Sequence, residues 1–243
     1  MMRRWGWLLG TVLVLVAPSA WAELRIPDVR YPSLPAQAVN AEGFVPNGWR
    51  LESQQADDLN GDGRPDLVLV LRQQDPVNVI RNDDGLGENP LDTNPRMLAV
   101  AFARDGGGYA LALQNHSLIP RHDIPTVEDM LEEGGVSVQR GALRVTLHFW
   151  ANAGSWSMGN TTYTFRWQNG RFELIGYDSD SVMRNSGASE SLSINYSTGK
   201  VKRTTGNMQD DKEAVTWQKL SSSRRWTLDE VGDGSAFDPL PAR

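Results

Sequence analysis

Hydrophobic and polar positions alternate along much of the chain with the period of a β-strand. From Leu143 to Trp150, every second residue is apolar and those between include arginine, threonine and histidine. This pattern predicts a strand with one face in solvent. Leu67–Leu71 is instead an unbroken run of leucine and valine, which is typical of a strand buried on both faces.

Short turn motifs join further predicted strands in pairs. An Asn-Gly pair at 169–170 favours a tight hairpin, because both residues of such a turn need positive φ angles. The predicted pairs are Met97–Ala103 with Tyr109–Leu113, Thr161–Trp167 with Arg171–Tyr177, and Ser191–Tyr196 with Lys200–Thr204. The sequence therefore predicts an all-β fold, mainly an antiparallel meander.

One short helix is predicted over Thr126–Glu133, with Thr126 as its N-terminal cap and two glycines ending it. We expect a single β-rich domain over residues 49–228, preceded by an extended lead-in at 23–48 and followed by an acidic, proline-containing tail at 229–243. No unit of about 40 to 60 residues repeats, so a complete propeller is not supported. A propeller-blade-like unit, a sandwich and a barrel all remain open.

The first residues have the pattern of a secretory signal peptide. Two arginines precede an apolar run from Trp5 to Val16, and Ala20-Trp21-Ala22 provides a small-x-small cleavage site. The run is shorter than the roughly 20 apolar residues of a membrane span. We expect cleavage before Glu23, export to the periplasm or beyond, and no membrane span in the mature chain.

Charge and composition exclude several classes of partner and chemistry. The formal net charge is −6 and becomes −8 without Arg3 and Arg4, whereas binding to a nucleic-acid backbone requires a basic patch. The chain has no cysteine, which removes disulfides, thiolate nucleophiles and cysteine-ligated metals. Its three histidines have no zinc-ligand spacing, and no nucleophilic serine elbow is present. We therefore identify no catalytic residue, and a non-catalytic role is favoured.

One motif has the residue types and the spacing of a metal-binding loop. Asp58, Asn60, Asp62 and Asp66 occupy positions 1, 3, 5 and 9 of a short segment, Gly63 occupies position 6, and the Arg64 carbonyl at position 7 is a further oxygen donor. In a tight loop such spacing directs alternate oxygens towards one hard cation. An all-oxygen set favours calcium over zinc or copper.

This motif resembles the calcium loop of FG-GAP or VCBS-type repeats, over about residues 58–71. The resemblance implies calcium held by Asp58, Asn60, Asp62, the Arg64 carbonyl and Asp66, in a loop that leads into a strand. Families with this loop normally repeat it, whereas here it occurs once. The alternative interpretation is a polar turn with solvated acids, because turns are rich in Asp, Asn and Gly for backbone reasons.

Aromatic residues suggest a second interpretation of function. Trp150, Trp156, Tyr163 and Trp167 gather in one strand-turn-strand segment with several amides. Such faces suit stacking on sugar rings, although strand aromatics are more often core or cross-strand pairs. The sequence thus favours an exported calcium-binding protein with a binding role and a protein or glycan partner in the cell envelope. A carbohydrate-binding module and a hydrolase with dispersed acidic residues are the alternatives.

Overall fold

The structure is a computed structural model that describes residues 24–221 and 224–240. The predicted signal peptide lies outside these residues. Nearly every strand pairs antiparallel with its neighbours, in two large sheets and one small one. Within the described part of the chain, no helix is long and apolar enough to cross a membrane. The predicted all-β class is confirmed.

The first sheet has five strands, and the strand next to one of its edges is buried on both faces. Its order is β1 (Gln37–Ala38), β7 (Tyr109–Asn115), β6 (Arg96–Ala103), β3 (Asp66–Gln73) and β2 (Trp49–Asp57). The leucines of β3 face one hydrophobic cluster and its valines, Val68 and Val70, face another. The strand is therefore buried on both faces, as its sequence predicts. Leu34 and Phe44, both in the lead-in, cover the leucine side of β3. Phe44 is the last residue of the 3-10 helix η1 (Ala41–Phe44).

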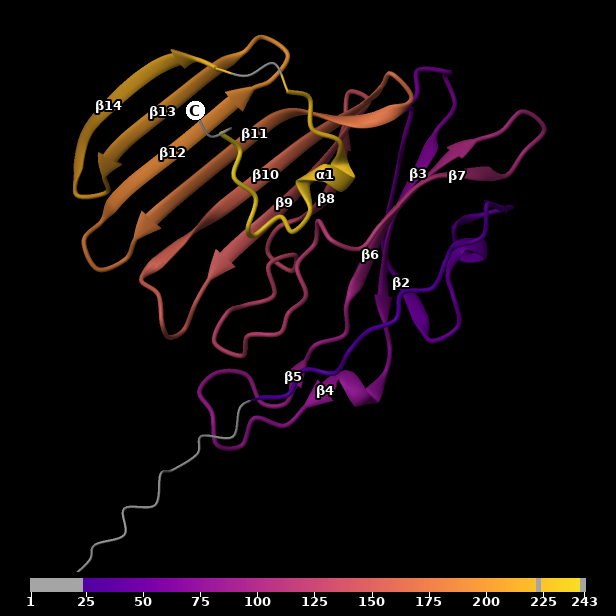
Figure 1. Cartoon of the computed structure of the whole chain (residues 1–243), viewed down its shortest axis with the longest axis horizontal. Helices are drawn as coiled ribbons and strands as arrows, with labels where there is room; N and C mark the ends of the chain where they lie inside the picture. Colours follow the sequence, from indigo (N-terminus) through magenta and orange to yellow (C-terminus); the bar gives the residue numbers. More distant parts are fainter. Residues whose placement is uncertain (1–23, 222–223, 241–243) are drawn as a thin grey trace, which may run out of the picture.

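The second sheet is a seven-stranded meander that curls into a half-barrel (Figure 1). Consecutive strands are neighbours throughout, and the Asn169-Gly170 turn has the expected positive φ angles, 54° and 74°. The strands are β8 (Gly135–Gln139), β9 (Ala142–Trp150), β10 (Ser157–Gln168), β11 (Arg171–Met183), β12 (Ala188–Asn195), β13 (Lys200–Asn207) and β14 (Asp210–Lys219). A small ribbon of β4 (Val79–Ile80) and β5 (Leu91–Asp92) follows the 3-10 helix η2 (Pro76–Asn78).

The two large sheets share one hydrophobic core. Val68 and Val70 of β3 belong to the same buried cluster as Leu143 of β9 and Tyr163 and Phe165 of β10. The inner face of each sheet thus removes the other from water, which is the principal source of stability in a chain without disulfides.

The C-terminal segment closes one part of this core. It begins with α1 (Leu228–Val231), whose Thr227 and Glu230 form a reciprocal capping box. Gly234 then passes so close to the core that an added Cβ would lie 2.6 Å from the Leu118 carbonyl oxygen. Its own carbonyl accepts a 2.6 Å hydrogen bond from the buried Tyr163 hydroxyl. Phe237 packs edge-on to the same tyrosine ring. The tail is therefore a component of the core.

The helix predicted over Thr126–Glu133 is wrong, because this segment forms turns instead. Its backbone bonds to β9: the Glu128 amide donates to the Trp150 carbonyl at 2.9 Å, and Met130 accepts from His148 at 2.7 Å. Val127 forms an isolated bridge with Ala151. These long-range bonds use backbone groups that a helix would have satisfied internally.

Changing Tyr163 to Phe tests how the tail is held. The substitution leaves the buried Gly234 carbonyl without its donor, so we expect a loss of about 1 to 2 kcal/mol in the free energy of unfolding. Urea denaturation followed by tryptophan fluorescence measures it. Tyr109→Phe is the control, because the Tyr109 hydroxyl makes no hydrogen bond to any described residue. An unchanged midpoint for Tyr163→Phe would contradict the account.

Candidate functional site

The candidate metal loop, residues 58–66, connects β2 and β3, the hairpin at one edge of the five-stranded sheet. β2 ends at Asp57 and β3 begins at Asp66, and these two residues are paired in register. All five predicted ligand residues therefore lie in one hairpin loop. The first six residues of the strand that follows, β3, are buried, so the loop has a rigid base.

Asp58 organises the first half of the loop. Its Oδ1 accepts hydrogen bonds from the backbone amides of Gly61 and Asp62 at 2.7 and 3.1 Å, and its Oδ2 accepts from Gly63 at 2.8 Å. Gly61 and Gly63 both have a φ of 83°, a region that favours glycine. The glycines thus let three amides turn inward around one carboxylate.

Asp66 fastens the second half to the sheet. Its carboxylate has no exposed surface. Oδ2 accepts from the amides of Leu59 and Asn60 at 2.9 and 3.3 Å, and Oδ1 accepts from Ala103 in β6 at 2.8 Å. Burial raises the pKa of the Asp66 carboxyl above its ordinary value, although these backbone donors oppose the rise. A cation close to this buried carboxylate would favour its ionised form.

Asp62 and Arg64 form the exposed side of the loop. Asp62 Oδ2 accepts from the side-chain Nδ2 of Asn60 at 3.0 Å and from Arg64 Nη2 at 2.6 Å. Arg64 Nη1 also donates to Asp105 at 2.6 Å, while its buried Nε has no acceptor in the described part of the chain. The hydrogen bond from the Arg64 backbone amide lowers the pKa of Asp62, with smaller contributions from the side chains of Asn60 and Arg64. Asp62 is therefore ionised at neutral pH and neutralised by a guanidinium.

The loop provides an all-oxygen donor set, which suits calcium chemically. In the arrangement seen here its carboxylates are held by hydrogen bonds within the chain. No group of three or more His, Cys, Asp or Glu residues in the described ranges is gathered to hold a metal ion. Calcium binding would therefore require Asp62 to exchange its arginine partner for the ion.

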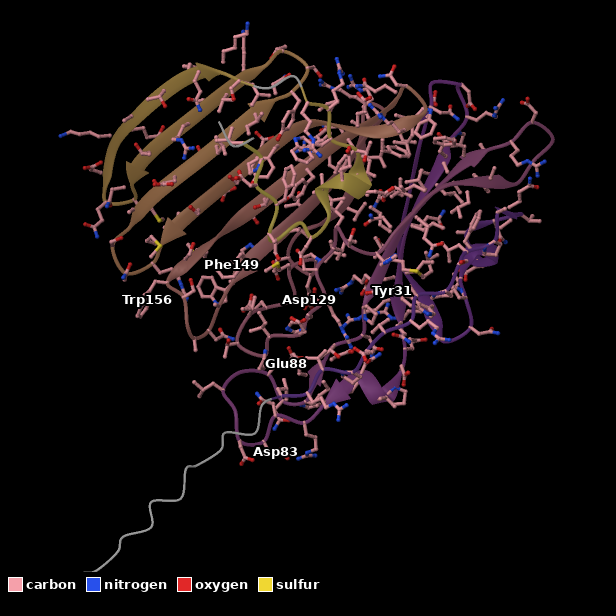
Figure 2. The ribbon with its side chains drawn as sticks, in the orientation of Figure 1. Tyr31, Asp83, Glu88, Asp129, Phe149 and Trp156 are labelled. Carbon is pink, nitrogen blue, oxygen red and sulfur yellow. The ribbon has the colours of Figure 1, made fainter. Side chains whose placement is uncertain are left out.

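The four aromatic residues of the second interpretation do not form one surface. Tyr163 is fully buried, and Trp167 packs against Phe102 with ring centroids 4.8 Å apart. Trp156 is 60% exposed, near the tip of the β9–β10 connection, where Figure 2 shows it at the edge of the molecule. The Arg184 guanidinium stacks on Trp150 at 4.0 Å and lies 5.9 Å from the Trp156 ring. Only Trp150 and Trp156 are thus brought together.

Contacts of Arg184 explain why Trp150 and Trp156 lie near each other. Arg184 Nη2 donates to the carbonyl oxygens of Ala151 and Ser155 at 2.5 and 2.9 Å. The guanidinium therefore fixes the connection from which Trp156 projects, and its stacking on Trp150 adds a cation–π contact.

A network of charged residues between the sheets was not found from the sequence. Arg96 of β6 contacts Glu52 of β2 and lies 2.8 Å from Asp129, in the turns that replace the predicted helix. Arg72 of β3 lies 3.4 Å from Glu52 and 3.1 Å from Asp92. These residues are far apart in sequence, and the register of β2 shifts at Glu52. Such a bulge changes the direction in which a side chain points, and the alternation of apolar and polar residues in the sequence does not predict this change.

Two members of the network, Arg72 and Asp129, also line a polar pocket of about 390 Å³. Figure 2 shows Asp129 between the two sheets, with Glu88 below it. The lining residues are Arg72, Glu88, His122, Glu128, Asp129, Glu132 and Glu133. This is where the acidic pair of a hydrolase could lie. However, Asp129, whose side chain is 5% exposed, is neutralised by arginine, so its first role is structural.

Comparison with known proteins finds no matching family model, no matching curated protein and no matching solved structure. Inference about function therefore depends on the residues described above.

Changing Asp129 to Asn tests the charged network. The substitution leaves Glu52 as the one described carboxylate in contact with the buried Arg96, and Arg72 shares that carboxylate; we therefore expect a loss of about 3 kcal/mol in the free energy of unfolding. Asp92→Asn is the matched control, because the Asp92 side chain is 41% exposed and contacts Arg72 alone within this network. That control should lose less than about 1 kcal/mol. Equal losses in urea denaturation would show that burial does not set the importance of Asp129.

Proposed function

We propose that the chain is an exported β-rich protein with a non-catalytic binding role, in which loop 58–66 binds a structural calcium ion. Asp58, Asn60, Asp62, the Arg64 carbonyl and Asp66 would hold the ion. On this proposal residues 1–22 are removed on export, and the partner is a protein or glycan of the cell envelope.

One observation carries the metal part of the proposal: the loop is folded around carboxylates. Asp58 accepts hydrogen bonds from three backbone amides of the loop, and the fully buried Asp66 accepts from two more. Asp66 makes no ion pair with any described lysine, arginine or histidine. A buried carboxylate without a cationic partner is costly. A divalent cation would supply the missing positive charge.

The position of the loop explains what the ion would do. Asp66 also accepts from Ala103, so the loop joins the β2–β3 hairpin to β6. An ion held here would stiffen three adjacent strands of the five-stranded sheet. With a dissociation constant on the order of 10⁻⁴ to 10⁻³ M, calcium at tenfold excess over that constant would stabilise the fold by about 1.4 kcal/mol.

Thermal unfolding in calcium and in EDTA tests the proposal. We expect calcium to raise the melting temperature of the wild-type protein by about 3 to 5 °C. Asp62→Ala should abolish this rise because it removes a ligand. Asp84→Ala is the matched control: Asp84 is an exposed acid in another turn, so its loss should leave the calcium response unchanged. A wild-type protein without a calcium response, or an Asp62→Ala variant that keeps one, would refute the assignment.

The variant Arg64→Gln tests whether Arg64 and calcium compete for Asp62. This variant keeps the backbone carbonyl but removes the guanidinium that competes for Asp62. Calcium affinity, measured by isothermal titration, should therefore increase, while the melting temperature in EDTA should fall slightly. Unchanged calcium affinity would show that Arg64 and the ion do not share Asp62.

Carbohydrate binding is a second candidate, favoured by the exposure of Trp156 beside the stacked Trp150–Arg184 pair. An exposed indole fixed by its neighbours is suited to stacking on a sugar ring. We expect a pull-down on peptidoglycan or chitin to retain the wild-type protein and to lose Trp156→Ala. Leu86→Ala is the control, because Leu86 is similarly exposed but lies in the connection between β4 and β5. No retention of the wild-type protein would end this candidate.

A further inference from the structure

The outer edge of the seven-stranded sheet is open. β14 is the terminal strand of the meander and pairs only with β13. Figure 1 shows it along the outer boundary of the half-barrel. Residues 212–219 are all exposed. An open edge of this kind offers unpaired backbone groups to another strand.

The register shows which backbone groups point outward. The Leu220 amide donates to the Gly199 carbonyl at 2.8 Å, so these two residues form a hydrogen-bonded pair. Because such pairs alternate in an antiparallel ladder, Ala214, Thr216 and Gln218 bond inward to β13. The amides and carbonyls of Glu213, Val215, Trp217 and Lys219 therefore point away from the sheet.

These four residues also share one face of the strand. Val215 is paired with Thr204, Trp217 with Lys202 and Lys219 with Lys200, which places their side chains on the face opposite the core. A Cβ on Gly206 would lie 3.4 Å from Cγ of Glu213, so Glu213 shares that face. Val215 and Trp217 are 46% and 65% exposed. The centre of the edge thus lacks the charged or proline residues that commonly block edge pairing.

We propose that β14 pairs antiparallel with β14 of a second copy of this chain, about a two-fold axis at Thr216. In this register Val215 lies opposite Trp217 of the second copy, and Glu213 lies opposite its Lys219. Every outward-pointing residue then meets another outward-pointing residue, as hydrogen bonding requires. The two half-barrels become one continuous sheet with both core faces on the same side.

The identity of the partner follows from this self-complementarity. A two-fold axis requires that a strand match its own reverse. The order acid, apolar, apolar, base at positions 213, 215, 217 and 219 meets that condition, with two apolar contacts flanked by two ion pairs. A shift that centres the axis on Val215 would place Glu213 against Trp217, and one centred on Trp217 would leave Lys219 against Val215. The edge is therefore complementary to itself in one register.

Disulfide trapping tests the register directly, because the chain has no cysteine. In the proposed pair Thr216 faces its own copy at a non-hydrogen-bonded position, where Cα atoms are about 4.5 Å apart, within disulfide range. Thr216→Cys should form a covalent dimer under copper–phenanthroline oxidation. Ala214→Cys is the matched control, because its two copies would lie about 13 Å apart and should not cross-link. A mixture of Ala214→Cys and Gln218→Cys proteins should cross-link, since those positions face each other.

Charge reversal tests the recognition without a covalent bond. Sedimentation equilibrium should show a concentration-dependent monomer–dimer equilibrium for the wild-type protein. Glu213→Lys and Lys219→Glu should each weaken dimerisation by about tenfold, because each creates like-charge contacts at both ends of the interface. The double variant should restore it. A strictly monomeric wild-type protein, equal cross-linking at 214 and 216, or no rescue by the double variant would overturn the proposal.

Discussion

The carboxylate of Asp66 is the interaction on which the first half of the molecule depends. It lies at the first residue of β3, it is completely buried, and it accepts backbone hydrogen bonds both from its own loop and from β6. The five-stranded sheet is therefore joined across β2, β3 and β6 at one ionisable group. Its burial raises its pKa, so the same group that joins the strands also carries a desolvation cost. The proposed calcium ion would offset this cost.

The second half of the molecule is joined to the first by different chemistry. The hydrophobic core between the sheets provides most of the packing, and the arginine–carboxylate network adds ion pairs between the first sheet and the turns at 126–133. Arg96 and Asp129 cross from β6 to turns that bond to β9. A buried charge pair adds little net stability compared with apolar packing, but it is strongly destabilising when broken. The network therefore specifies how the two sheets are arranged more than it holds them together.

Local patterns in the sequence predict most of this fold. Strand β3, the alternating β9 and the hairpins of the meander follow from periodicity and turn residues, because these features depend on neighbours in the chain. β2 and β14 were missed for physical reasons: β2 is polar and interrupted by a shift at Glu52, and β14 is exposed on both faces. The predicted helix at Thr126–Glu133 was wrong because its backbone bonds to a strand that is distant in sequence. The short helix α1, by contrast, had a visible signal in the Thr227 and Glu230 capping box.

The candidate sites likewise differ in how far the sequence predicts them, according to whether their residues are close together in the chain. The candidate metal loop is local, so its spacing predicted which residues would share a turn, although not the pairing of Asp62 with Arg64. The charged network needs residues from four distant segments and leaves no local signature. The prediction that four aromatic residues form one surface holds for only two of them, because Tyr163 and Trp167 turn towards the core while Trp150 and Trp156 do not.

Diffraction from crystals grown in calcium, with anomalous data, tests the central claim most directly. The account predicts one anomalous peak inside the loop, with oxygens of Asp58, Asp62 and Asp66 at about 2.3 to 2.6 Å and the Arg64 guanidinium displaced from Asp62. A loop without a peak, in which Asp62 still contacts Arg64, would contradict it.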